Sequence, residues 1–279
     1  MKFSILIAHY NNAEYFKDCY QSIINQTYEN WEAIILDDCS ESNEQEKVKE
    51  IIKGDSRFIY YQNESNFGVG ITKSKLIDLA TGDICGFVDP DDAILPSAIQ
   101  RSVDVFKSKK NIVLTYSRFM TCDENLKPLK PFKGARQVPN KDLYFFNYPI
   151  QIAHFVSFKK EVYNNTEKVD TTLKIAEDQD LYLKLYEKGD VYFINETNYL
   201  YRTHQRGISQ NNNKKKSYDY FAKVILNTFK RRGINKINGH KITNELIDSE
   251  EVFKLLNYQN SLLQRIKKKL KIFVQNFSK

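Results

Sequence analysis

Three carboxylates stand within four residues of one another, at Asp89, Asp91 and Asp92, and they directly follow an apolar run at residues 84–88. Such a run predicts a buried strand of a parallel sheet, and open α/β sheets bind their ligands at the carboxyl ends of the strands. Because packed carboxylates repel one another, the cluster favours a site for a divalent cation and phosphate oxygens. The fixed φ of Pro90 lets the side chains of Asp89 and Asp91 reach one site.

The same Asp-Pro-Asp-Asp sequence is also typical of a structural turn. In that alternative, Asp92 caps a helix that begins near Pro96. The motif alone leaves both alternatives open.

Four apolar runs with helical spacing between them must position this cluster. They cover residues 3–8, 31–36, 58–61 and 84–88, and polar residues follow each of them: Asn11 and Asn12, Asp37 and Asp38, Asn66, and the three aspartates. Repeated βα units predict a largely parallel, doubly wound sheet, because parallel neighbours require crossover connections. The polar clusters should therefore converge on one edge of the sheet.

The rest of the chain has a weaker pattern. We predict a helix at 98–106, strands at 112–116, 152–158, 191–194 and 199–201, and a helix from Ile175 that carries Glu177, Asp178 and Asp180 in its first turn. Acidic residues are ordinary dipole partners there. A polar boundary at 211–213 precedes helical patterns at 218–231, 243–256 and 261–277.

Composition limits the class of protein. A chain of 279 residues can bury one substantial core, and its net charge of +7 is concentrated in the last third. The four cysteines form no CxxC pair, which argues against a zinc site or a disulfide framework and favours a reducing cytosol. No apolar run is long enough to span a membrane. No GxGxxG follows the first predicted strand, which disfavours a nicotinamide oxidoreductase.

Several short motifs, taken in order, resemble one known family. They are Ile7-Ala8-His9-Tyr10-Asn11, Asp37-Asp38, Asn66 with Gly68 and Lys73, Asp89-Pro90-Asp91-Asp92, Glu177-Asp178 and His204. Over residues 3–209 the chain resembles the inverting nucleotide-sugar glycosyltransferases of family 2, which are common in bacterial glycan assembly. The resemblance implies an α/β GT-A (Rossmann-like) domain with a mostly parallel sheet and a C-terminal helical extension.

The resemblance also implies a division of the chain and of the site. Residues 1–119 would bind the nucleotide sugar, residues 120–210 the acceptor, and residues 211–279 would form a basic helical extension. The positions that match the family's nucleotide-binding residues are Ala8, Tyr10, Asp37, Asp38, Asn66, Gly68, Lys73 and Asp89. Asp91 and His204 match the ligands of Mn²⁺ or Mg²⁺, and Asp178 matches the catalytic base.

Some residues depart from the family pattern or have simpler explanations. Lys73 stands where members often carry arginine, so it offers a point charge without a bidentate fork. Asp178 could merely favour the helix start, and His204 could be an ordinary loop histidine. Asp37 could cap the following helix, while Asn66 and Gly68 could be turn residues.

The resemblance implies transfer of a sugar from a UDP-sugar to a hydroxyl of a glycan or lipid-linked glycan, by metal-assisted single displacement with inversion. The alternatives are transfer onto a polyprenyl phosphate, or a non-catalytic nucleotide- or carbohydrate-binding protein on the same fold. We expect a cytoplasmic protein and no nucleic-acid partner. The apolar stripe at 261–277, with lysines beside it, predicts either attachment to the anionic inner face of the plasma membrane or a protein contact, including self-association.

Overall fold

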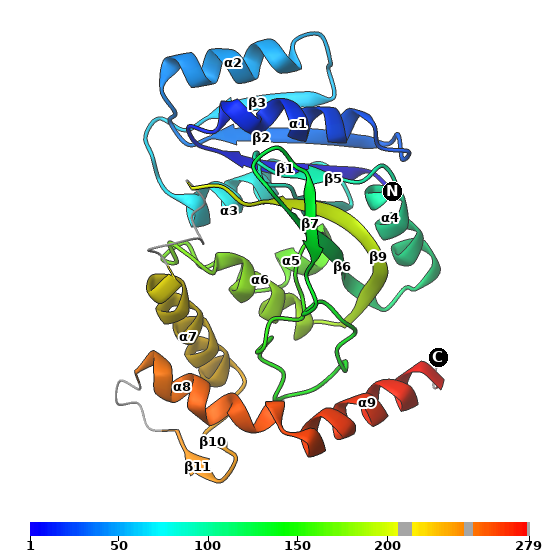
Figure 1. Ribbon diagram of the computed structural model, residues 1–279, viewed down its shortest axis with the longest axis vertical. Coiled ribbons are helices and arrows are strands. Elements are labelled where there is room, and N and C mark those ends of the chain that lie inside the picture. The colour runs from blue at the N-terminus through cyan, green and yellow to red at the C-terminus, as the bar shows by residue number, and fades with distance from the viewer. Residues whose placement is uncertain (206–213, 243–247, 278–279) are drawn as a thin grey trace.

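The computed structural model describes residues 1–205, 214–242 and 248–277 (Figure 1). The first half alternates strands and helices: β1 (Phe3–His9), α1 (Ala13–Ile24), β2 (Trp31–Asp37), α2 (Ser42–Ile52), β3 (Phe58–Gln62), α3 (Val69–Leu79) and β4 (Ile84–Phe87). These four strands pair in parallel in the order β3-β2-β1-β4. The predicted βα units are therefore present, and the polar residues that follow β1, β2 and β4 lie at one edge.

The second half of the chain supplies the remaining strands of the sheet, which differ widely in length. It contains β5 (Ala93–Ile94), α4 (Ala98–Ser108), β6 (Ile112–Cys122), β7 (Pro128–Pro131), β8 (Ser157–Lys159), α5 (Lys160–Asn164), α6 (Glu177–Tyr186) and β9 (Asp190–Arg202). β8 lies antiparallel between β4 and β6, β6 and β9 are parallel, and β5 and β7 pair antiparallel at the margins. The α/β fold is confirmed, and the parallel arrangement belongs mainly to the first half.

Two predictions about strands need correction. The apolar residues of 152–158 are buried, but only Ser157–Lys159 forms a strand, because the segment before it packs against the core without pairing. The two strands predicted at 191–194 and 199–201 are one long strand, β9, which pairs with β6 along most of its length through register shifts.

The alternation of side chains along the strands divides the core between the two faces of the sheet. Ile5, Ile7 and Ile35 pack toward α1, α2 and α4. Leu6 and Leu36 face the opposite core, to which α3, α6 and the later helices contribute. Burial on both faces explains why the first strands read as continuous apolar runs.

The C-terminal part consists of α7 (Lys214–Arg231), the small hairpin β10 (Lys236–Ile237) and β11 (His240–Lys241), α8 (Ser249–Leu256), a 3₁₀ turn at Asn257–Asn260 and α9 (Leu262–Phe277). The predicted boundary at 211–213 lies outside the described residues. Helices α7 and α8 bury residues such as Val224, Phe229 and Phe253 in the same core as α6. None of the described helices has both the length and the apolarity to cross a membrane.

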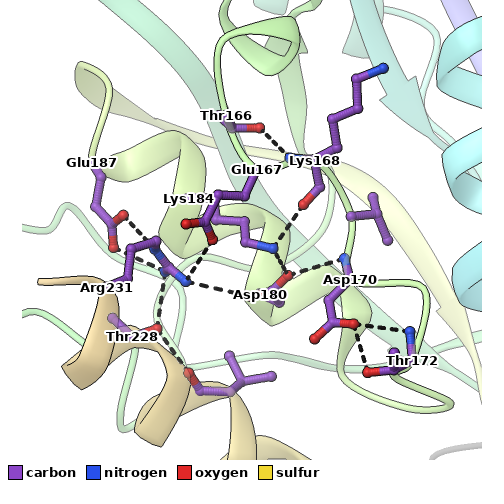
Figure 2. A network of polar contacts seen from close by, with 12 residues as sticks. Thr166, Glu167, Lys168, Asp170, Thr172, Asp180, Lys184, Glu187, Thr228 and Arg231 are labelled. Carbon is purple, nitrogen blue, oxygen red and sulfur yellow. Dashed lines mark hydrogen bonds and ion pairs between the residues drawn. The ribbon is translucent and has the colours of Figure 1, made fainter.

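An ionic network, buried at Asp180 and Lys184 and more exposed at Glu187, fastens α7 to α6 (Figure 2). Arg231 contacts Glu187 at 2.6 Å and approaches Asp180 to 3.9 Å, while Lys184 contacts Asp180 at 2.6 Å and donates to the carbonyl of Lys168. Burial raises the pKa of Asp180 although Lys184 acts in the opposite direction. The buried charge of Asp180 requires cationic partners, which Lys184 of α6 and Arg231 of α7 supply. The network therefore connects α7 to the helix that begins with Glu177 and Asp178.

Candidate active site

A cavity of about 680 Å³ opens at the carboxyl ends of β1 and β4, beside the first turn of α6. Segments far apart in the sequence line it, which is the expected arrangement for an open α/β sheet. Ten of the predicted site residues line this cavity: Ala8, Tyr10, Asp38, Asn66, Gly68, Lys73, Asp89, Asp91, Asp178 and His204. The cavity therefore brings together all but one of the side chains singled out from the sequence.

Asp91 and His204 meet directly although 113 residues separate them. His204 Nε2 lies 2.7 Å from Asp91 Oδ2, and the His204 side chain is only 4% exposed. The ring of Tyr15 packs against the imidazole at 4.8 Å, and Arg202 Nε donates to the main-chain carbonyl of Asp91. Tyr15 thus fixes the imidazole of His204, and Arg202 fixes the main chain of Asp91. Both Asp91 and His204 line the cavity.

Asp92 has a different place from its two neighbours. Its buried carboxylate accepts hydrogen bonds from the Tyr199 hydroxyl and the Arg202 main-chain N–H, both at 2.7 Å. The Tyr199 hydroxyl in turn accepts the N–H of Asp89. Burial, with repulsion from Asp91 and Asp89, raises the pKa of Asp92 well above its usual range. Asp92 thus fastens the aspartate loop to β9, and the alternative in which it caps a helix is wrong, since Ser97 precedes α4.

The two acids at the end of β2, Asp37 and Asp38, have different surroundings. Asp38 accepts hydrogen bonds from the main-chain N–H groups of Phe67 and Gly68, at 3.0 and 2.7 Å, and from the Asn63 amide. It thereby holds the loop that leads into α3, where Gly68 has φ of +86°, a conformation that favours glycine. Asn66 is exposed on the same loop and Tyr10 is half exposed.

Asp37 is the predicted site residue that does not line the cavity. Its carboxylate is fully buried and contacts His9 Nδ1 at 2.7 Å and the Ser40 N–H at 2.7 Å. Burial opposes ionisation, but these hydrogen bonds prevail and lower the pKa of Asp37. Asp37 does not itself line the cavity but contacts His9, which does, so any effect of Asp37 on a bound nucleotide would be indirect.

Lys73 forms an ion pair with Glu177, and both residues line the cavity. The Nζ–Oε1 distance is 2.7 Å, and the two side chains are 13% and 8% exposed. Burial disfavours the ammonium ion, but the charges of Glu177, Asp89 and Asp178 outweigh it and raise the pKa of Lys73. Lys73 therefore stays protonated near neutral pH, with its charge already balanced in part by Glu177.

Asp178 lies at the first turn of α6, immediately after Ala176 and Glu177, and the φ of Ala176, +64°, lies in the left-handed region. The Oδ1 atom of Asp178 accepts the N–H of Gln179 at 2.8 Å, and its Oδ2 lies 3.2 Å from the Gln179 amide nitrogen. The Gln179 amide oxygen accepts from the fully buried Asn147 at 2.7 Å. A chain of amide hydrogen bonds therefore fixes the orientation of the Asp178 carboxylate.

His154 is a cavity residue that sequence analysis missed. Its ring stacks on Tyr199 at 4.7 Å and on Tyr201 at 5.7 Å, and burial lowers its pKa despite the nearby Asp89 and Asp178. It lies in the segment 152–158, whose apolar residues predict a strand but give no sign that this histidine faces the cavity. Lys174, which also lines the cavity, was missed as well.

Comparison with known proteins identifies the family. The chain is 29% identical over 184 residues to an uncharacterized glycosyltransferase of Methanocaldococcus jannaschii, which covers 65% of this chain and 63% of the relative. It is 26% identical over 251 residues to chondroitin synthase of Escherichia coli, covering 86% of this chain and 34% of that enzyme. The chain thus matches less than two thirds of the length of either relative.

The fold is also shared with a solved structure. S. aureus TarS 1–349 in complex with UDP-GlcNAc superposes with a TM-score of 0.70 at 18% identity, over 94% of this chain and 73% of that one. The model of the glycosyl transferase family 2 matches residues 4–166, which is more than half of the chain and includes the four parallel strands and the aspartate loop. The chain therefore belongs to glycosyl transferase family 2.

Proposed function

We propose that the protein transfers a sugar from a nucleoside diphosphate, UDP being the expected nucleotide, to a hydroxyl of a glycan or lipid-linked glycan, with inversion at the anomeric carbon. The observation that carries the proposal is the convergence of the Asp91–His204 pair and Asp178 on one cavity. The cavity is of the size that small-molecule ligands occupy in proteins. TarS, which has the same fold, binds UDP-GlcNAc, and chondroitin synthase builds a glycan, which supports this class of donor and acceptor.

The donor set at Asp91 and His204 fits a divalent cation. One carboxylate oxygen and one imidazole nitrogen suit Mn²⁺ or Mg²⁺, which usually take few protein ligands and complete their coordination with phosphate oxygens and water. Among the described residues, no group of three or more His, Cys, Asp or Glu side chains is placed to hold a metal ion, so protein side chains alone would supply few of its ligands. When bound, such an ion would neutralise charge on the departing diphosphate as a Lewis acid.

Asp178 has the position of a general base in this proposal. It would take the proton of the acceptor hydroxyl while that oxygen bonds to the anomeric carbon and the bond to the diphosphate breaks. The hydrogen bonds from Asn147 to Gln179 and from Gln179 to Asp178 orient the Asp178 carboxylate. Less free energy is then needed to align this carboxylate with the acceptor hydroxyl for proton transfer. Because Asp178 acts as a base and forms no covalent bond to the sugar, one displacement occurs and the configuration inverts.

Lys73 and Asp38 would serve the nucleotide. Lys73 carries a positive charge at the cavity, and binding of a diphosphate would place a second anion beside the one it already has in Glu177. Asp38 holds the loop that carries Asn66 and Gly68 and thereby shapes the wall of the cavity. The assignment of residues 1–119 to the donor and 120–210 to the acceptor is part of the same proposal.

The experiment is a panel of nucleotide sugars assayed for transfer or hydrolysis with Mn²⁺, with Mg²⁺ and with a chelator. We expect turnover of a UDP-sugar that a chelator abolishes and that added metal restores. Equal turnover in chelator would contradict the roles of Asp91 and His204.

Transfer onto a polyprenyl phosphate is the second candidate. Lys174 lines the cavity only four residues before Asp178 and is exposed, so it offers a cation for an acceptor phosphate. A comparison of polyprenyl phosphates with neutral glycan acceptors separates the two reactions. A non-catalytic binding protein would bind UDP without any turnover, and the Asp178→Asn variant would then be indistinguishable from the wild type.

A further inference from the structure

Helix α9 packs on the rest of the protein through its polar face. Its half-buried positions form one helical stripe: Gln264, Lys268, Lys271, Ile272 and Gln275. Gln275 exchanges two hydrogen bonds with the main chain of Asn140, at 2.8 and 2.9 Å. Lys268 donates to the side chain of Gln259 at 3.0 Å. The contacts that hold α9 in place are thus mainly polar.

The opposite face of α9 is apolar and points to solvent. Its side chains are between 47% and 72% exposed: Leu262, Leu263, Ile266, Leu270, Phe273 and Val274. An ordinary amphipathic surface helix has the reverse orientation, with its apolar stripe against the core. A contiguous apolar face on one element, in contrast to scattered single residues, marks an interaction surface.

The charge of α9 limits what can cover this face. The helix carries five cations and no acidic residue: Arg265, Lys267, Lys268, Lys269 and Lys271. Lys267 and Lys269 are exposed, and helical geometry places them on either side of the apolar stripe. A second copy of α9 laid against this face would bring two strongly cationic helices together, whereas an anionic surface would be attracted.

We propose that the exposed face of α9 inserts into the interface of an anionic lipid bilayer, with the helix lying in the membrane plane. Helices with a large apolar face flanked by lysines bind in this manner, and the headgroups attract the cations while the apolar side chains enter the acyl boundary. A helix of 16 residues is about 24 Å long, so it lies on the bilayer and does not cross it. In Figure 1, α9 lies at the end of the molecule opposite α2, together with α8 and the β10–β11 hairpin.

The test is sedimentation of the whole 279-residue protein with vesicles of phosphatidylcholine alone or with about 30% phosphatidylglycerol. We expect binding to the anionic vesicles at least about tenfold tighter than to neutral ones, and weaker in about 0.5 M salt than in about 0.1 M. Leu270→Glu should weaken binding at least about tenfold, and Lys267→Gln with Lys269→Gln should weaken it by about fivefold for each lysine removed.

Leu129→Glu is the matched control, because Leu129 on β7 is as exposed as Leu270, at 60% each, and lies outside α9. It should leave vesicle binding unchanged. Circular dichroism and UDP affinity should be the same for all variants, which separates this inference from the proposed reaction. Absence of binding to anionic vesicles at the lower salt concentration would overturn the proposal. A dimer in ultracentrifugation that Leu270→Glu dissociates would also overturn it and assign the face to a second copy.

Discussion

The ion pair between Lys73 and Glu177 gives a prediction whose size can be worked from the structure. At 2.7 Å and an effective dielectric constant of about 20, the Coulomb attraction is about 6 kcal/mol, and desolvation of the two buried groups consumes much of it. Removal of one partner leaves the other charge buried without compensation, which costs about 3–5 kcal/mol. Lys73→Met should therefore lower the free energy of unfolding by about 3 kcal/mol, because Glu177 then faces Asp178 and Asp89 without its cation.

The assay is a double-mutant cycle by urea unfolding at neutral pH with the wild type, Lys73→Met, Glu177→Gln and the double variant. The double variant should be more stable than Lys73→Met alone, because neither charge remains unpaired. Both variants that lack Lys73 should lose affinity for UDP, so the recovery concerns stability and not binding. If Lys73→Met costs less than about 1 kcal/mol, or if the two single effects simply add, the pair is not the coupled unit described above.

Three further outcomes follow from individual contacts. Gln179→Met should lower kcat about tenfold with little change in KM, because it removes a hydrogen bond that orients the Asp178 carboxylate and does not touch the substrate. A rise in KM as large as the fall in kcat would contradict a positioning role. Glu32 is buried, yet hydrogen bonds from its neighbours lower its pKa from 4.5 to about 2, so its stabilisation is present above pH 4.5 and is lost as the pH falls toward 2. Glu32→Gln should thus cost about 2–3 kcal/mol in thermal or urea unfolding at about pH 7 and much less near pH 2. Arg231→Met removes one of two arginines that contact Glu187, since Arg232 also contacts it at 2.7 Å, so the variant should destabilise the protein by only about 1 kcal/mol; urea unfolding with no loss of stability would mean that the Arg231 contacts in Figure 2 contribute nothing.

Local patterns in the sequence were sufficient to predict the strands of the first half of the fold. Continuous apolar runs identify β1 to β4, because both faces of these strands are buried. Strand ends followed by polar residues then locate Asp38, Asp89 and Asp91 at one edge of the sheet. These inferences need only the period of the hydrophobic residues and the direction of parallel strands.

Contacts between distant segments could not be predicted in the same way. No periodicity reveals that Lys73 meets Glu177, that Tyr199 binds Asp92, or that Asp37 contacts His9 and does not itself line the cavity. The orientation of α9 is a similar case, because a hydrophobic stripe indicates which side chains share a face but not whether that face is buried.

The four cysteines are free thiols in the described structure. Cys19, Cys85 and Cys122 are buried as free thiols and Cys39 is partly buried. Burial raises the pKa of Cys85 to about 12, so this thiol is unreactive near neutral pH. A reducing location remains the prediction that these thiols favour.

The most direct test of the central claim is the rate of sugar transfer by Asp178→Asn, measured beside its affinity for UDP. The asparagine side chain keeps the shape of the aspartate it replaces but cannot take a proton. We therefore predict a loss of turnover of at least about a hundredfold, with UDP affinity unchanged within about twofold. Turnover close to that of the wild type would contradict the assignment of Asp178 as the base.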